Sequence, residues 1–122
     1  MTAAVRAIRG ATTVDEDTVE QVVERTLALM EAILERNGVD HDDIISILFT
    51  ATDDVHSTFP ALGARKMGLG DVPLICAREL DITTGKARCL RVMMHFTTER
   101  TRAELHHIYL EGAIDLRDDL PS

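Results

Sequence analysis

The sequence predicts an α+β fold, a mixed five-stranded sheet with one long helix on one face. Three observations support this prediction. Apolar residues recur at helical spacing through residues 19–34, apolar runs of strand length lie before and after that stripe, and glycine-containing turns separate the later runs. A chain of 122 residues is the size of one domain, so residues 1–122 are taken as a single unit.

The first third of the chain predicts a strand and then the long helix. Residues 5–11 alternate as a strand does, which places Arg9 on the same face as its apolar neighbours. Thr13 offers an N-cap, with Glu16 three residues on in a capping-box pattern. The helix should end at Asn37-Gly38, because glycine takes the left-handed turn that follows many helices.

The rest of the chain predicts four more strands and a short helix. The expected strands are residues 44–51, 72–77, 89–94 and 107–116, and the short helix is residues 61–67. The first of these strands is an almost unbroken apolar run, as expected in the interior of a sheet. One long helix cannot cover five strands, so the other face or the edges are expected to meet another subunit.

Charge and hydropathy exclude some classes of protein. The net charge is −8, and residues 1–55 hold all of it, with 12 acidic and 4 basic residues against 9 of each in the remainder. An acidic surface argues against a nucleic-acid partner. No apolar stretch approaches the roughly 18 residues of a membrane span, and arginines interrupt the N-terminal segment where a secretory signal needs an apolar core. A cytoplasmic protein is expected.

Arg91 is the residue that most needs an explanation, because it lies inside the apolar run 89–94. Taking a guanidinium out of water costs several kcal/mol, and arginine does not shed its proton, so a matched anion is required. That anion is either a protein carboxylate in a structural ion pair or a bound ligand. Glu79 follows the strand 72–77 directly, which places it and Arg91 on neighbouring elements.

The usual signatures of metal, nucleotide and covalent chemistry are missing. The five histidines have no metal-ligand spacing, and no glycine-rich phosphate loop or nucleophile elbow occurs. Cys76 is a possible nucleophile, but without a partner histidine a buried thiol is the better interpretation. Cys76 and Cys89 are expected to stay reduced. What remains at strand ends suits a compact carboxylate anion, with Glu79 orienting a hydroxyl: Arg9, Arg65, Cys76, Glu79, Arg91 and Tyr109.

Five segments resemble one known family, the small monofunctional chorismate mutases of the trimeric α/β type. The segments are IRGATTV (8–14), ATDDVHSTFPA (51–61), VPLIC (72–76), ELDITTGKARCLRVMM (79–94) and IYLEGAIDLR (108–117). The resemblance implies a homotrimer whose sheets form a pseudo-barrel core, with active sites in the clefts between subunits. It also implies conversion of chorismate to prephenate by a Claisen rearrangement in the shikimate pathway, without a cofactor.

The resemblance further implies roles for individual residues. Arg91 and Glu79 are the expected catalytic pair, with Arg91 at the ether oxygen and Glu79 at the ring hydroxyl. Arg9 and Tyr109 are expected to hold the carboxylates of the substrate. The remaining expected substrate-binding residues are Phe59, Arg65, Ile75, Cys76, Ala77, Arg78, Leu116 and Arg117.

Two other functions stay open at this stage. The first is a trimeric binding protein for a small carboxylate that keeps the arginine cleft without turnover. The second is an enzyme on a related trimeric fold that acts on imino or keto acids, which needs an arginine at the interface but not Glu79 beside Arg91. Leu62 and Ile75 also depart from the residue types common in the family, and their effect is not evident from the sequence.

Overall fold

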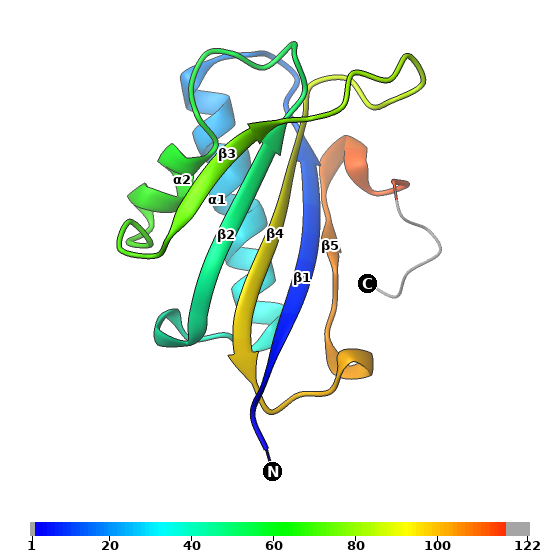
Figure 1. Ribbon diagram of the computed structural model, residues 1–122. Helices are drawn as coiled ribbons and strands as arrows, with labels where there is room; N and C mark the ends of the chain where they lie inside the picture. Colours follow the sequence, from blue (N-terminus) through cyan, green and yellow to red (C-terminus); the bar gives the residue numbers. More distant parts are fainter. Residues whose placement is uncertain (1, 117–122) are drawn as a thin grey trace.

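A computed structural model describes residues 2–116 of the chain (Figure 1). They form one mixed sheet of five strands with two helices on one of its faces, which confirms the predicted α+β architecture. The strands are β1 (Ala4–Thr13), β2 (Ile44–Ala51), β3 (Leu74–Arg78), β4 (Cys89–Thr98) and β5 (Ile108–Tyr109). The helices are α1 (Val19–Asn37) and α2 (Ala61–Lys66), and short 3-10 turns are η1 (His41–Asp43), η2 (Arg102–Glu104) and η3 (Glu111–Ala113).

The strand order is β3-β2-β4-β1-β5. β4 pairs antiparallel with both β1 and β2, while β3 and β5 are added parallel at the two edges. The expectation that Glu79 and Arg91 lie on neighbouring elements is therefore wrong, because β2 lies between β3 and β4. The crossover through α2 carries β3 to the outer side of β2, and β4 then returns on the inner side.

The core fills the space between the sheet and α1. Side chains of β1, β2 and β4 alternate, so Ile8, Phe49 and Phe96 point toward the helices and are almost fully buried. Gly10 of β1 packs directly against side chains of α1. A Cβ there would meet Ile33 Cδ1 and the carbonyl oxygen of Ile108, each at 3.0 Å, so glycine permits this close packing.

The start of α1 corrects the predicted N-cap. Thr18, not Thr13, precedes the helix, and its hydroxyl accepts a hydrogen bond from Gln21 N at 3.2 Å. Thr13 instead ends β1 opposite Cys89, and its hydroxyl accepts from Gly112 N at 2.9 Å. Glu16 takes no part in a capping box. The end of α1 was predicted correctly, since Gly38 has the left-handed φ of 61°.

The last strand is much shorter than predicted. β5 contains only Ile108–Tyr109, and the chain then turns into η3 instead of extending to residue 116. Glu111 causes the turn with a left-handed φ of 52°, and the Thr13 hydroxyl fixes the next amide. Alternation of apolar side chains beyond Tyr109 therefore does not describe a strand, and Ile114 is exposed.

The face of the sheet opposite α1 is open in the subunit. It exposes apolar side chains from three strands, namely Val5 of β1, Ile75 of β3 and Met93 of β4. Arg91 shares this face, because it lies two residues from Met93 on the same strand. No helix within residues 2–116 is long and apolar enough to cross a membrane.

Candidate functional site

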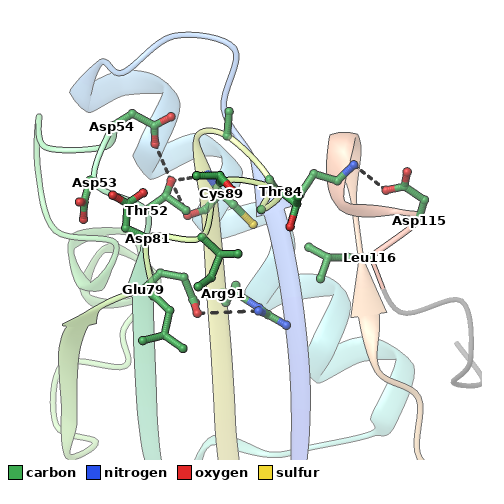
Figure 2. Close-up of a pocket in the computed structure, with 16 residues that line it drawn as sticks. Thr52, Asp53, Asp54, Glu79, Asp81, Thr84, Cys89, Arg91, Asp115 and Leu116 are labelled. Carbon is green, nitrogen blue, oxygen red and sulfur yellow. Dashed lines mark hydrogen bonds and ion pairs between the residues drawn. The ribbon is translucent and has the colours of Figure 1, made fainter.

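A cleft of about 880 Å³ lies at the end of the open face (Figure 2). Its walls are the loop after β2 (residues 52–54), the loop between β3 and β4 (residues 79–87), Cys89 and Arg91 of β4, and residues 115 and 116. This volume is within the range of pockets that bind small molecules. The sheet thus supplies a rigid floor, and the loops at its end supply the rim.

Arg91 and Glu79 lie together in this cleft. Arg91 Nη1 is 3.8 Å from Glu79 Oε1, and their side chains are 34% and 23% exposed. The distance allows electrostatic attraction but is too long for a hydrogen bond. The guanidinium of Arg91 makes no hydrogen bond to any other residue in the described part of the chain. Its guanidinium therefore keeps N–H groups for a ligand, while Glu79 only partly offsets its charge.

Thr50 binds the other oxygen of the Glu79 carboxylate. The Thr50 hydroxyl donates to Glu79 Oε2 at 2.6 Å. Thr50 lies on β2 directly opposite Arg91 of β4, and it is half-buried. The strand between the two charged residues thus provides a hydrogen bond to one of them.

Asp53 and Asp54 form part of the rim and are both engaged. Asp53 accepts two hydrogen bonds from Arg78, from Nε at 2.6 Å and from Nη2 at 2.5 Å, which lowers its pKa. Burial acts to raise the pKa of Asp54, but hydrogen bonds from the Thr52 hydroxyl and from the backbone of Arg88 outweigh it, and the net shift is downward. Both carboxylates are therefore built into the rim as anions.

A third ion pair joins two segments that line the cleft. Lys86 Nζ of the β3–β4 loop is 2.7 Å from Asp115 Oδ1, and this pairing lowers the pKa of Asp115. Asp115 follows η3, so the contact ties the loop at one edge of the cleft to the segment beyond β5 (Figure 2).

Cys89 lines the cleft, and its thiol has low reactivity. Burial raises the pKa of its thiol to about 11, with Arg91 acting weakly in the opposite direction. Cys89 and Cys76 are both free thiols. A thiol with so high a pKa is protonated at neutral pH and is not a nucleophile.

The cleft is unusual for an anion site because its lining is acidic. Five carboxylates line it against two cations. The carboxylates are Asp53, Asp54, Glu79, Asp81 and Asp115, and the cations are Lys86 and Arg91. Lys86 is already paired with Asp115, which leaves Arg91 as the cation of the lining that remains for a ligand.

Arg9 and Tyr109 lie on the same face of the sheet as Arg91. Ala11 of β1 is opposite Arg91 on one side and opposite Tyr109 of β5 on the other, so these three residues form a row across the sheet. Arg9 precedes Ala11 by two residues and shares its face. The Tyr109 hydroxyl is buried without a hydrogen-bond partner in the described chain. Neither Arg9 nor Tyr109 lines the cleft itself.

The predicted residues of β3 divide between two faces. Ala77 is opposite Thr50, so Ala77 and Ile75 share the open face. The side chain of Cys76 points the other way and packs against the core beneath the helices. Arg78 is exposed and pairs with Asp53 at the rim.

Three further predicted residues lie apart from Arg91 or beyond the described chain. Phe59 is exposed in the loop before α2, and Arg65 is exposed on α2, so neither belongs to the cleft of its own subunit. Leu116 does line the cleft. Arg117 lies outside the described residues. No cluster of three or more potential metal ligands occurs within residues 2–116.

Comparison with known proteins decides the family. The model of the family chorismate mutase type I matches residues 5–120. The chain belongs to this family. The resemblance seen in the sequence is thereby confirmed over nearly the whole chain.

The chain is similar to other chorismate mutases along nearly their full length. The chain is 42% identical over 117 residues to chorismate mutase AroH of Bacillus subtilis, covering 95% of this chain and 92% of that protein. It is 40% identical over 119 residues to chorismate mutase AroH of Thermus thermophilus, covering 97% and 98%. A solved chorismate mutase from Clostridium thermocellum superposes with a TM-score of 0.87 at 44% identity, covering 88% of this chain and 96% of that one.

Three residues in the cleft or beside it were not predicted from the sequence, namely Thr50, Lys86 and Asp115. Thr50 carried a usable signal, because it and Ser46 are the two hydroxyl residues of the mostly apolar strand β2 and the period of the strand places both on the face of Leu48. Lys86 and Asp115 carried none. They are 29 residues apart in the sequence, and only the folded sheet brings them together.

Proposed function

We propose that this chain is an isomerase that converts chorismate to prephenate, a step toward phenylalanine and tyrosine, at the cleft beside Arg91. Membership of the chorismate mutase family supports the reaction. The single observation that supports the location is the state of Arg91. Its side chain is one-third exposed in the cleft, and among residues 2–116 only the Glu79 carboxylate, 3.8 Å away, is near enough to pair with it.

The reaction explains why such a cation is useful. The ether C–O bond of chorismate breaks as a C–C bond forms within the same molecule, so no proton has to move. Negative charge builds on the ether oxygen in the transition state, and a fixed guanidinium aimed there stabilises that state more than the ground state. One such donor contributes about 3 to 4 kcal/mol. A millionfold acceleration needs about 8 kcal/mol.

The remaining acceleration comes from holding the substrate in its compact reactive conformer. In the proposed site, Glu79 accepts the ring hydroxyl, while Arg9 and Tyr109 bind carboxylates. The row of Arg91, Ala11 and Tyr109 across the sheet supports this assignment. The unpartnered Tyr109 hydroxyl supports it too, because a buried hydroxyl without a hydrogen bond is costly until a ligand provides one.

We also propose that the protein is a homotrimer whose open sheet faces form a common core. Exposed Val5, Ile75 and Met93 on that face support burial against other copies. The acidic lining of the cleft supports it independently, because within residues 2–116 the lining offers a dicarboxylate no cation besides Arg91 and the paired Lys86. A neighbouring subunit is the proposed source of Phe59 and Arg65, which lie outside the cleft of their own subunit. A cytoplasmic location stays a prediction.

Chorismate turnover and oligomeric mass test the proposal together. Loss of the ultraviolet absorbance of chorismate should depend on the protein and yield prephenate. Arg91→Ala should lower kcat/KM at least roughly a hundredfold, with the trimer mass by light scattering unchanged. Arg36→Ala is the matched control, because Arg36 is an exposed arginine on α1. A wild-type protein that binds chorismate without turnover would favour a binding protein instead.

A further inference from the structure

Thr50 lies beside the cleft, on the same face of the sheet as Arg91. It lies on β2 between the strand that leads to Glu79 and the strand that carries Arg91, opposite Ala77 on one side and Arg91 on the other. Its side chain is not part of the cleft lining, yet its hydroxyl donates to Glu79 Oε2 at 2.6 Å. Thr50 therefore contacts a residue of the cleft without lining the cleft itself.

We propose that Thr50 is a positioning residue that keeps the Glu79 carboxylate from closing onto Arg91. The inference rests on the proposed function of the Arg91 cleft. Glu79 holds one oxygen on the Thr50 hydroxyl, and its other oxygen stays 3.8 Å from Arg91 Nη1, beyond hydrogen-bond distance. Arginine and carboxylate groups favour a direct pair with two hydrogen bonds when nothing restrains them. Such a pair would use the N–H groups that the ether oxygen needs.

The hydroxyl acts on the side chain of Glu79 and is not needed to hold its main chain. Glu79 N already donates to the carbonyl oxygen of Ala51 at 3.0 Å, which continues the β2–β3 pairing by one more bond. A purely structural bond between Thr50 and Glu79 would add little to a strand end that is fixed in this way. The main effect of this hydrogen bond to a charged carboxylate is instead to fix the orientation of the Glu79 side chain.

The test compares Thr50→Val with Thr50→Ser. Valine keeps the shape and the β preference of threonine but removes the donor, so kcat/KM should fall roughly tenfold to a hundredfold, as for loss of a hydrogen bond to a charged group. The loss should fall mainly on kcat, because Arg91 acts in the transition state. Serine keeps the hydroxyl and should restore most of the activity.

A double-mutant cycle separates positioning from a structural role. In a Glu79→Ala background the Thr50→Val change should have little further effect on kcat/KM, because its target is gone. The same loss in both backgrounds would overturn the proposal. Thr12→Val is the matched control, since the buried Thr12 hydroxyl has no hydrogen-bond partner within residues 2–116, and this variant should keep wild-type activity.

Crystal structures of the wild type and Thr50→Val without ligand give a readout that does not depend on activity. The Arg91–Glu79 separation should shorten from 3.8 Å to hydrogen-bond distance in the variant. An unmoved carboxylate would disprove the positioning role. If the wild type does not turn over chorismate, the proposed function fails, and these structures still report whether Thr50 restrains Glu79.

Discussion

The side-chain amide of Asn37 makes two hydrogen bonds with the backbone of His106, one as donor and one as acceptor. Asn37 Nδ2 donates to the carbonyl oxygen of His106 at 2.9 Å, and Asn37 Oδ1 accepts from His106 N at 2.7 Å. Nδ2 also donates to the carbonyl oxygen of Ile33 at 3.0 Å. Asn37 is completely buried. The last residue of α1 therefore holds the segment that leads into β5 and Tyr109.

We expect Asn37→Leu to destabilise the protein strongly. Leucine has a similar size but removes all three hydrogen bonds of the buried Asn37 amide, so the free energy of unfolding should fall by about 3 kcal/mol or more. Urea denaturation at a fixed protein concentration measures this change. Glu31→Ala, an exposed position of the same helix, is the control and should shift stability very little. A loss below about 1 kcal/mol for Asn37→Leu would contradict the buried-amide account.

Asp17 should make the stability of the loop before α2 depend on pH. Its carboxylate accepts from His56 N and Ser57 N, each at 3.0 Å, and the hydrogen bond from His56 is the main reason that the pKa of Asp17 lies below its usual 3.8. A lowered pKa in the folded state adds stability above the unfolded pKa, and that stability disappears as the pH falls through the folded pKa.

Asp17→Asn should therefore be less stable than the wild type at pH 6, and the difference should shrink below about pH 4. Denaturation curves at several pH values provide the measurement. Asp42→Asn is the control, because the exposed Asp42 side chain makes no hydrogen bond or ion pair with any residue of the described chain. A difference between wild type and Asp17→Asn that stays constant down to pH 2 would show that the charge of Asp17 is not responsible.

Cys89 should resist alkylation in the folded protein. With its pKa raised to about 11 by burial, roughly one thiol in a thousand is ionised at pH 8, and the side chain is also inaccessible. A Cys76→Ser variant leaves Cys89 as the one cysteine of the chain. Mass spectrometry after iodoacetamide should find no adduct in the native variant and one adduct in urea. Equal labelling rates in the two states would mean that the floor of the cleft opens readily.

Arg91→Lys should show that geometry matters as well as charge. Lysine keeps a positive charge but loses the planar fork of N–H groups, so turnover should fall greatly while KM changes less. Steady-state kinetics on chorismate provide the comparison, with light scattering to verify the oligomer. Wild-type turnover in this variant would mean that charge alone is sufficient.

Much of the fold could be predicted because its signals are local. The stripe of α1 and the apolar run of β2 each identify an element within one stretch of sequence, and β2 has the predicted bounds. The N-cap residue of α1 could not be identified from the neighbouring sequence alone. Thr13 and Thr18 are each followed at the third position by a glutamate or glutamine, and only pairing of β1 with β4 as far as Thr13 excludes the first.

The site was predictable where one residue was out of place in its own strand. Arg91 and Glu79 were found because a charge inside an apolar strand and a carboxylate at a strand end need partners, and the fold brings these two together. The contact of Thr50 with Glu79 could not be found in this way. It depends on β2 lying between β3 and β4, which is decided by the path of the crossover through α2 and not by either residue.

The uncovered side of the sheet has a consequence for how the protein behaves in dilute solution. Under the proposed assembly, much of the apolar surface that a subunit removes from water is removed only when copies meet. The midpoint of thermal unfolding should then rise with protein concentration, and dilution alone should weaken the enzyme. The concentration of the protein in a cell would then help to determine the stability of each folded subunit.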